Sequence, residues 1–240
     1  MYRFLSDISF APDEGARSPH VTLTYAQSLD GKIAGRHGKQ LILSGPQSMT
    51  ATHILRSKHD AILVGIGTVL NDDPRLTVRL NPEDLPQGSG PVQHPQPIIL
   101  DSTLRFPTTA KLVLPTSLKK PWIFTSPIHD FQRKRDLEAL GAKVYVLDVD
   151  AQGHLSLPDL LSTLHQLSIQ SLMVEGGAGV ISSFLKSGLV QSFLLTIAPV
   201  YVGVDGINAV DNAEAAPVFE NISYHTLGRD VMMVARPHYQ

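Results

Sequence analysis

A glutamate and a cluster of glycines lie together in SLMVEGGAGVISSFLKSGLV, residues 171–190. Glu175 ends an apolar run that is typical of a buried strand. The glycines Gly176, Gly177 and Gly179 come next, before a run with the apolar spacing of a helix. Backbone N–H groups at such a helix start are free, and glycine lets an anion approach them closely. The pattern predicts a phosphate site; a tight turn that needs glycine dihedrals is the alternative.

A second segment, DAILVGIGTVLNDDPRLTVR (60–79), has the same design. Gly65 and Gly67 follow another short apolar run, and Thr68 stands where a helix N-cap is expected. Ligands of open α/β sheets bind at the carboxyl ends of the strands. Two such turns at one edge would suit a dinucleotide, although neither has the spacing G-x-G-x-x-G of the common fingerprint.

Asp72 and Asp73 form a possible metal pair in the same segment. The sequence Asp-Asp-Pro is more often a helix cap followed by a chain exit. Ten histidines occur without the H-E-x-x-H spacing, and the chain has no cysteine. We therefore expect no metal, no disulfide and no thiolate nucleophile.

Three basic side chains are candidates for ligand contacts. Arg79 lies on an alternating stretch and could bind a phosphate in bidentate fashion, or it could be a solvated arginine on an edge strand. Arg56 lies at the end of the first predicted helix. Lys32 follows the Asp30-Gly31 turn, and it could contact a ligand or be a free lysine on the surface.

Short apolar runs alternate with amphipathic runs along most of the chain. Strands are predicted at 21–29, 60–67, 97–100, 121–126, 144–148, 171–175, 192–203 and 231–237, and helices at 46–58, 130–143, 157–168 and 180–188. This order predicts an α/β fold with a mostly parallel central sheet, flanking helices and antiparallel C-terminal strands. We expect one domain over residues 1–240, with an N-terminal arm at 1–19 and a Pro/Gly-rich surface loop at 80–97.

Bulk properties exclude several classes of protein. The net charge of -2 offers no basic surface for nucleic acid. No apolar run reaches the ~18 residues of a membrane span, and the first twenty residues lack the apolar stretch of a signal peptide. We expect a cytoplasmic protein without a membrane or nucleic-acid partner.

Four segments together resemble the riboflavin-biosynthesis reductases, which act on diaminohydroxyphosphoribosylaminopyrimidine and are related in fold to dihydrofolate reductase. They are SLDGKIA (28–34), LRSKHDAILVGIGTVLNDDPRLTVR (55–79), ILDSTLRFP (99–107) and VEGGAGVISSFLKSGLVQSFLLTIAPVYVG (174–203). Bacterial members usually carry this reductase behind a zinc deaminase with a Pro-Cys-x-x-Cys signature. Without cysteine, the chain is similar to the stand-alone fungal and archaeal enzymes, which reduce before deamination.

The resemblance implies NADPH-dependent reduction of the ribosyl group of 2,5-diamino-6-ribosylamino-4(3H)-pyrimidinone 5′-phosphate by a homodimer. It implies catalytic roles for Lys32 and Glu175. Substrate contacts are expected from Arg56, Leu76, Arg79 and Glu175. Cofactor contacts are expected from Thr68, Asp72, Ser102, Gly176, Gly177, Ala178, Gly179 and Val180. Ser126 and the run Arg133–Arg135 are candidates for the cofactor's 2′-phosphate.

Other functions stay open at this point. A reductase of the same fold could act on a pterin or on the deaminated pyrimidine, although the early helix lacks the buried carboxylate of a folate reductase. A non-catalytic nucleotide-binding module or a phosphosugar-binding transferase would need only the two anion turns. Lys32 and Glu175 beside those turns favour an enzyme. The apolar strands at 192–203 and 231–237 would leave an edge for pairing, which favours a homodimer.

Overall fold

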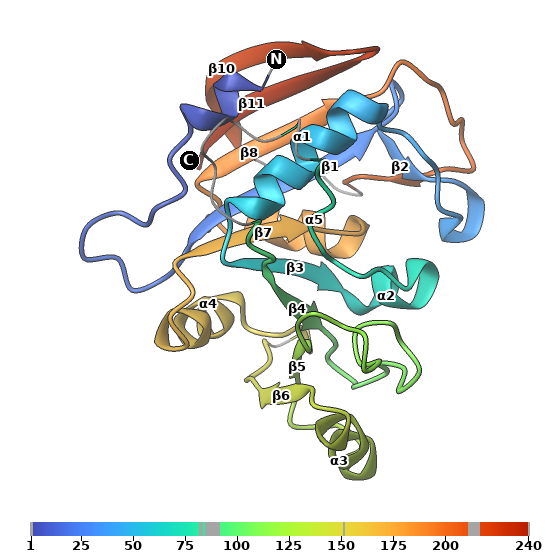
Figure 1. Ribbon diagram of the computed structural model, residues 1–240, viewed down its shortest axis with the longest axis vertical. Helices are drawn as coiled ribbons and strands as arrows, with labels where there is room; N and C mark the ends of the chain where they lie inside the picture. The colour runs from blue at the N-terminus through green and yellow to red at the C-terminus, as the bar shows by residue number, and fades with distance from the viewer. Residues whose placement is uncertain (1, 82–83, 85–91, 151, 211–216, 240) are drawn as a thin grey trace.

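The computed structural model describes residues 2–81, 84, 92–150, 152–210 and 217–239. Its centre is a nine-stranded sheet of order β10-β11-β8-β1-β7-β3-β4-β5-β6 (Figure 1). The strands are β1 (His20–Gln27), β3 (Ala61–Gly65), β4 (Gln96–Leu100), β5 (Trp122–Thr125), β6 (Lys143–Val146), β7 (Ser171–Glu175), β8 (Ser192–Ile197), β10 (Val218–Leu227) and β11 (Asp230–His238). The run from β6 to β8 is parallel, and β11 and β10 add to it in antiparallel fashion. The predicted fold class is thus confirmed.

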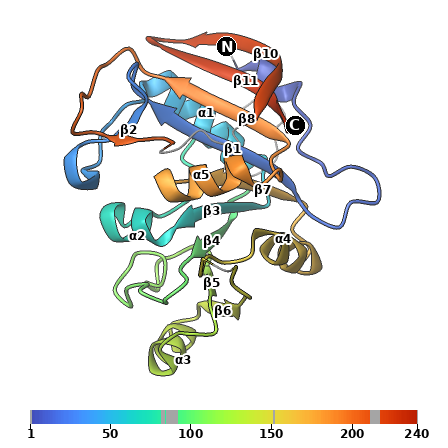
Figure 2. The same cartoon turned by 180° about the vertical axis from the view of Figure 1, so that it is seen from behind.

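Helices cover both faces of the sheet, because each parallel strand is apolar on both sides. The helices are α1 (Pro46–Ser57), α2 (Ile66–Asp72), α3 (Phe131–Ala139), α4 (Leu157–Gln166) and α5 (Ala178–Lys186), with 3-10 turns η1 (Arg3–Ser6) and η2 (Arg36–Gly38). Buried side chains of α4 and α5 pack on one face, and those of η1, α1, α2 and α3 pack on the other. Accordingly α1 lies in front of the sheet in Figure 1, and α5 lies in front of it in Figure 2.

The structure differs from the sequence prediction in two strands. β8 ends at Ile197 instead of continuing to 203, since Pro199 has no N–H to donate. A two-stranded sheet of β2 (Lys32–Ala34) and β9 (Ile207–Asn208) was not predicted, because such short strands carry no periodic pattern. The edge strands of this sheet are β10 and β6. Both β8 and β11 have neighbours on each side, so the predicted pairing edge was wrong.

The helix after β3 begins earlier than predicted. Gly65 is the N-cap of α2, and Thr68 lies in the first turn, so the assignment of Thr68 as N-cap was wrong. The chain turns directly after Gly65, where a Cβ would lie 2.9 Å from Cγ2 of Val180. Most of the predicted loop at 80–97 lies outside the described residues.

Candidate active site

The two glycine turns lie side by side, because β3 and β7 are neighbouring parallel strands. A Cβ on Gly176 would lie 2.8 Å from Cβ of Val180, and one on Gly177 would lie 3.8 Å from Oγ1 of Thr68. None of the glycines from 176 to 179 has a positive φ, so the alternative of a turn requiring left-handed dihedrals does not apply. Glycine is needed at Gly176 for close packing, whereas a Cβ on Gly179 would meet open space.

The start of α5 is a place for an anion. Gly177 is its N-cap, no side chain caps the free N–H groups, and the first helical residues are Ala178, Gly179 and Val180. Nine residues give this helix a dipole whose positive end faces the turn. The neighbouring α2 has only seven residues, and it brings the Thr68 hydroxyl beside this turn.

Glu175 and Arg56 form a bidentate ion pair at the end of β7. Nε of Arg56 donates to Oε1 at 2.7 Å and Nη2 donates to Oε2 at 2.6 Å, while Nη1 donates to the carbonyl of Thr77 at 3.1 Å. The side chains are only 14% and 20% exposed. Burial alone would lower the pKa of Arg56, but the charge and hydrogen bonds of Glu175 outweigh it and raise that pKa. The two hydrogen bonds therefore hold the Glu175 carboxylate in a fixed position.

Arg79 lies beside this pair on an irregular segment, not on the edge strand considered from the sequence. Its backbone N–H lies 3.3 Å from Nδ1 of His53, and its Nε lies 3.4 Å from Nε2 of the same ring. Burial, followed by the charges of Arg56 and Arg79, lowers the pKa of His53 to about 4, so the ring is neutral at pH 7. The Arg79 side chain itself is exposed and able to meet a ligand.

The Leu76 side chain belongs to the core. It is 3% exposed and packs among the apolar residues under α2. The φ of 51° at Leu76 and that of 41° at Asp73 turn the chain after α2, and the substrate contact implied for Leu76 stays a prediction. Asp73 accepts from the Lys111 N–H at 2.9 Å and pairs with that lysine, which confirms a structural use of this aspartate.

Lys32 lies on β2, which follows the carboxyl end of β1. Its ammonium donates to Oδ1 of Asn208 on β9, and among the described residues no hydrogen bond or ion pair joins it to Glu175. Asp30 fixes this corner by accepting from the Ser28 hydroxyl and from the N–H groups of Val202 and Gly203. The Ser28 bond, with these two, lowers the pKa of Asp30 to about 2.

The remaining predicted cofactor residues surround the same edge. Asp72 ends α2, and burial raises the pKa of its carboxyl. Ser102 follows β4, and its carbonyl accepts from the Ser126 N–H at 3.2 Å. Nη1 of Arg133 donates to the Phe106 carbonyl at 3.2 Å, which places the start of α3 beside the loop after β4. Within the described ranges, no three His, Asp or Glu side chains gather as a metal site would require.

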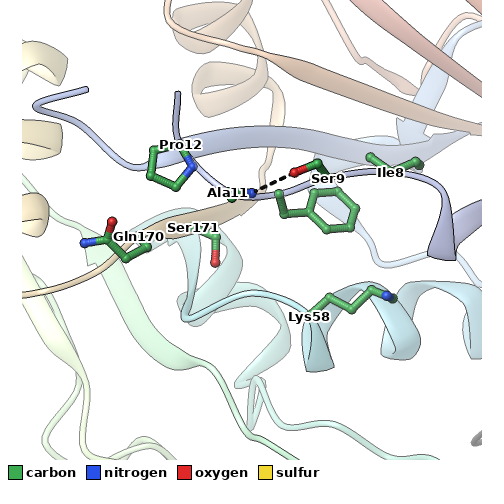
Figure 3. Close-up of a pocket in the computed structure, with 8 residues that line it drawn as sticks. Ile8, Ser9, Ala11, Pro12, Lys58, Gln170 and Ser171 are labelled. Atoms are coloured by element: carbon green, nitrogen blue, oxygen red, sulfur yellow. Dashed lines mark hydrogen bonds between the residues drawn. The ribbon is translucent and has the colours of Figure 1, made fainter. Parts of the chain in front are cut away.

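A cavity of about 560 Å³ lies at the opposite edge of the sheet (Figure 3). Residues 8–12 of the N-terminal arm line one part of it, and Lys58, Gln170 and Ser171 line the rest. None of the predicted site residues belongs to it. We place the functional site at the carboxyl edge instead, because the paired charges and the glycine turns converge there.

Two contacts of the candidate site were missed from the sequence. His53 contacts Arg79, and the spacing of His53 and Arg56 in α1 could have indicated only that the two share one helical face. Asn208 lies far from Lys32 in the chain and carried no signal.

Solved structures share this architecture. The riboflavin biosynthesis reductase Rib7 of Saccharomyces cerevisiae superposes with a TM-score of 0.75 at 29% identity, covering 98% of each chain. RibD of Acinetobacter baumannii superposes with a TM-score of 0.76 at 25% identity, covering 93% of this chain and 59% of that one. The fold is that of the dihydrofolate-reductase-like reductases.

Similarity in sequence identifies the family of this chain. The family model of the RibD C-terminal domain matches residues 19–233, and the chain belongs to this family. A protein of Debaryomyces hansenii named 2,5-diamino-6-ribosylamino-4(3H)-pyrimidinone 5′-phosphate reductase is 38% identical over 86% of this chain and 85% of its own length. A protein of the same name from Archaeoglobus fulgidus is 35% identical, over 77% and 82%. The riboflavin biosynthesis protein RibD of Bacillus amyloliquefaciens is 39% identical over 77% of this chain but only 47% of its own length.

Proposed function

We propose that this protein reduces the ribosyl group of 2,5-diamino-6-ribosylamino-4(3H)-pyrimidinone 5′-phosphate to the ribityl group, with NADPH as hydride donor. The observation that carries this proposal is the Arg56–Glu175 pair at the mouth of the paired glycine turns, in a chain of this family. The pair offers a fixed carboxylate for a heterocycle, and the turn offers a phosphate site next to it.

The turn before α5 fits the pyrophosphate of a dinucleotide. Its N–H groups have no side-chain cap, and the open space at Gly179 leaves room for phosphate oxygens. The segment 176–180 would hold the pyrophosphate, with the Thr68 hydroxyl beside it. Asp72 and Ser102 would contact the rest of the cofactor. When bound, the cofactor supplies a hydride to the anomeric carbon of the ring-opened imine.

The protein's own residues orient the substrate, whose imine nitrogen takes up one proton as the hydride adds to the anomeric carbon. Because both oxygens of Glu175 accept from Arg56, this carboxylate is suited to accept hydrogen bonds from the amino groups of the pyrimidine. Arg56 would act mainly by holding Glu175. Arg79 has a side chain free to bind the 5′-phosphate, and Lys32 would donate to the sugar hydroxyls as the chain opens.

The direct test is oxidation of NADPH by the purified protein, followed by absorbance. The phosphorylated substrate is offered once with its amino group and once deaminated, and NADH is the parallel control. Faster oxidation with the amino form and NADPH is expected. Faster oxidation with the deaminated form would place the reaction after deamination. Tight NADPH binding without oxidation in either case would overturn the substrate assignment.

We further propose that the chain works as one cytoplasmic reductase domain and forms a homodimer through its sheet edge. β10 is one of the two edge strands, and Val218, Ile222 and Tyr224 on it are exposed. No helix of the described part is long and apolar enough to cross a membrane. Light scattering on the purified protein checks the assembly, and a monomer at assay concentration would contradict it.

A further inference from the structure

The two arginines of the site differ in how much of each guanidinium is already used. Arg56 donates from Nε, Nη1 and Nη2 to Glu175 and Thr77. Arg79 is held only at Nε, and its Nη1 and Nη2 have no hydrogen-bond partner among the described residues. A guanidinium anchored at Nε still presents two parallel donors, which is the geometry that binds a phosphate in bidentate fashion.

His53 is the group that holds Arg79. It lies in α1, its residue is 4% exposed, and its ring contacts both the backbone N–H and the Nε of Arg79. A buried polar ring normally satisfies its own hydrogen-bonding groups, and here the main partner is an exposed arginine. The ring therefore links the rigid helix to a side chain on an irregular segment.

Only the neutral ring can do this. A neutral imidazole accepts on one nitrogen, so only one of the two contacts is a full hydrogen bond in a given tautomer. Burial and the charges of both arginines keep the His53 pKa low, while the charge of Glu175 and a hydrogen bond with the Thr77 backbone partly oppose them. The Arg79 N–H at Nδ1 and the Arg79 Nε at Nε2 compete for the single lone pair of the neutral ring. The tautomer with its proton on Nδ1 leaves Nε2 as the acceptor for Arg79.

We propose that His53 is a positioning residue whose Nε2 accepts from Nε of Arg79 and fixes the guanidinium with both terminal nitrogens toward the 5′-phosphate of the substrate. The proposal deepens the proposed function and rests on its assignment of Arg79. Fixing the fork before binding reduces the side-chain entropy that is lost when the phosphate arrives.

The test compares His53→Ala, His53→Gln and His53→Asn with wild type, on the substrate with and without its 5′-phosphate. Gln places an oxygen near the position of Nε2, and Asn places one near Nδ1. For His53→Ala we expect the KM of the phosphorylated substrate to rise about 10-fold, with kcat within about two-fold. The KM of the dephosphorylated riboside should stay unchanged, and Gln should restore affinity better than Asn.

Two results would overturn the positioning role. An equal rise of both KM values in His53→Ala would show a general structural defect, and an unchanged KM would show that Arg79 needs no anchor. The ¹⁵N NMR spectrum of the ring at pH 7 gives a second reading that does not depend on folding of a variant. Nε2 is expected to lack a proton, and a protonated Nε2 would contradict the proposed acceptor.

Affinity for ribose 5-phosphate, measured by calorimetry, separates this inference from the proposed function. Loss of affinity in Arg79→Ala and His53→Ala, with no further loss in the double variant, supports the positioning role even if the proposed reaction is not observed. A substrate KM that depends on Arg79 but not on His53 leaves the function standing and rejects the positioning role. Independence from both residues rejects the phosphate assignment as well.

Discussion

At the amino edge of the parallel sheet, His59 and Asp60 have hydrogen-bond partners within the protein, whereas at the carboxyl edge the Arg79 side chain is exposed. His59, 3% exposed, contacts the Leu55 carbonyl at 2.7 Å and the Thr22 hydroxyl at 2.9 Å. Asp60 accepts from the N–H groups that begin β7. Arg79, by contrast, is exposed beyond its anchor. Polar groups whose hydrogen bonds are made within the protein stabilise the fold, and groups with free donors are available to bind a ligand.

Glu175→Gln should have the largest effect on the carboxyl edge. It keeps the shape but removes the charge that faces Arg56, so we expect kcat to fall by at least ~10²-fold. NADPH oxidation at saturating substrate measures it, with thermal unfolding as the control for folding. Near-normal turnover would remove Glu175 from the catalytic role.

Arg79→Ala should act on binding, not on turnover. Loss of charged hydrogen bonds to a phosphate is expected to raise the substrate KM by ~10- to 10²-fold, with a small change in kcat. Arg75→Ala is the matched control, because Arg75 is also an exposed arginine after α2. Equal effects of the two substitutions would show a nonspecific loss of positive charge.

Substitution of the glycines in the turn should affect either stability or cofactor binding, depending on the position. Gly176→Ala forces a Cβ against Val180 and is expected to cost about 1–3 kcal/mol of unfolding free energy. Gly179→Ala has open space, so its stability should be unchanged or raised, while the KM for NADPH rises about 10-fold if the pyrophosphate lies there. Chemical denaturation and cofactor titration measure the pair. An unchanged NADPH KM in Gly179→Ala would place the cofactor elsewhere.

Substitutions at the amino edge should change the free energy of unfolding without changing turnover. Burial, partly opposed by the bond to the Leu55 carbonyl, lowers the pKa of His59 to about 4 from 6.5. Between pH 4 and pH 6.5, His59 is therefore protonated in the unfolded chain but neutral in the folded protein. Stability is full above pH 6.5 and falls toward pH 4, by up to about 1.4 kcal/mol per pH unit for each such histidine.

His59→Gln should flatten this slope in denaturation curves taken from pH 7 to pH 4.5. His154→Gln is the control, since 74% of the His154 side chain is exposed. An unchanged slope in His59→Gln would mean that other groups govern the acid sensitivity.

Sequence patterns predicted the fold well because buried parallel strands and amphipathic helices have strong periods. The alternation from β3 to β8 was visible residue by residue, and the glycine turns marked the edge that carries the candidate site. The roles of the site residues stay predictions. A local sequence pattern does not show which distant residue a side chain will contact. Arg56, for example, pairs with Glu175, which lies 119 residues later in the sequence. Likewise, the burial of the Leu76 side chain depends on packing between distant segments, which the sequence around it does not show.

The order of strands has a consequence during synthesis of the protein. β1 is made early, yet both of its neighbours, β7 and β8, lie after residue 170. At a ribosomal rate of about 10 residues per second, β1 has no neighbouring strand to pair with for on the order of ten seconds after it is synthesised. β3 likewise lacks its neighbour β7 during this time, so the Arg56–Glu175 pair forms only after residue 175 has emerged. A ribosome stalled before residue 170 would hold a nascent chain with bare strand edges and no binding site.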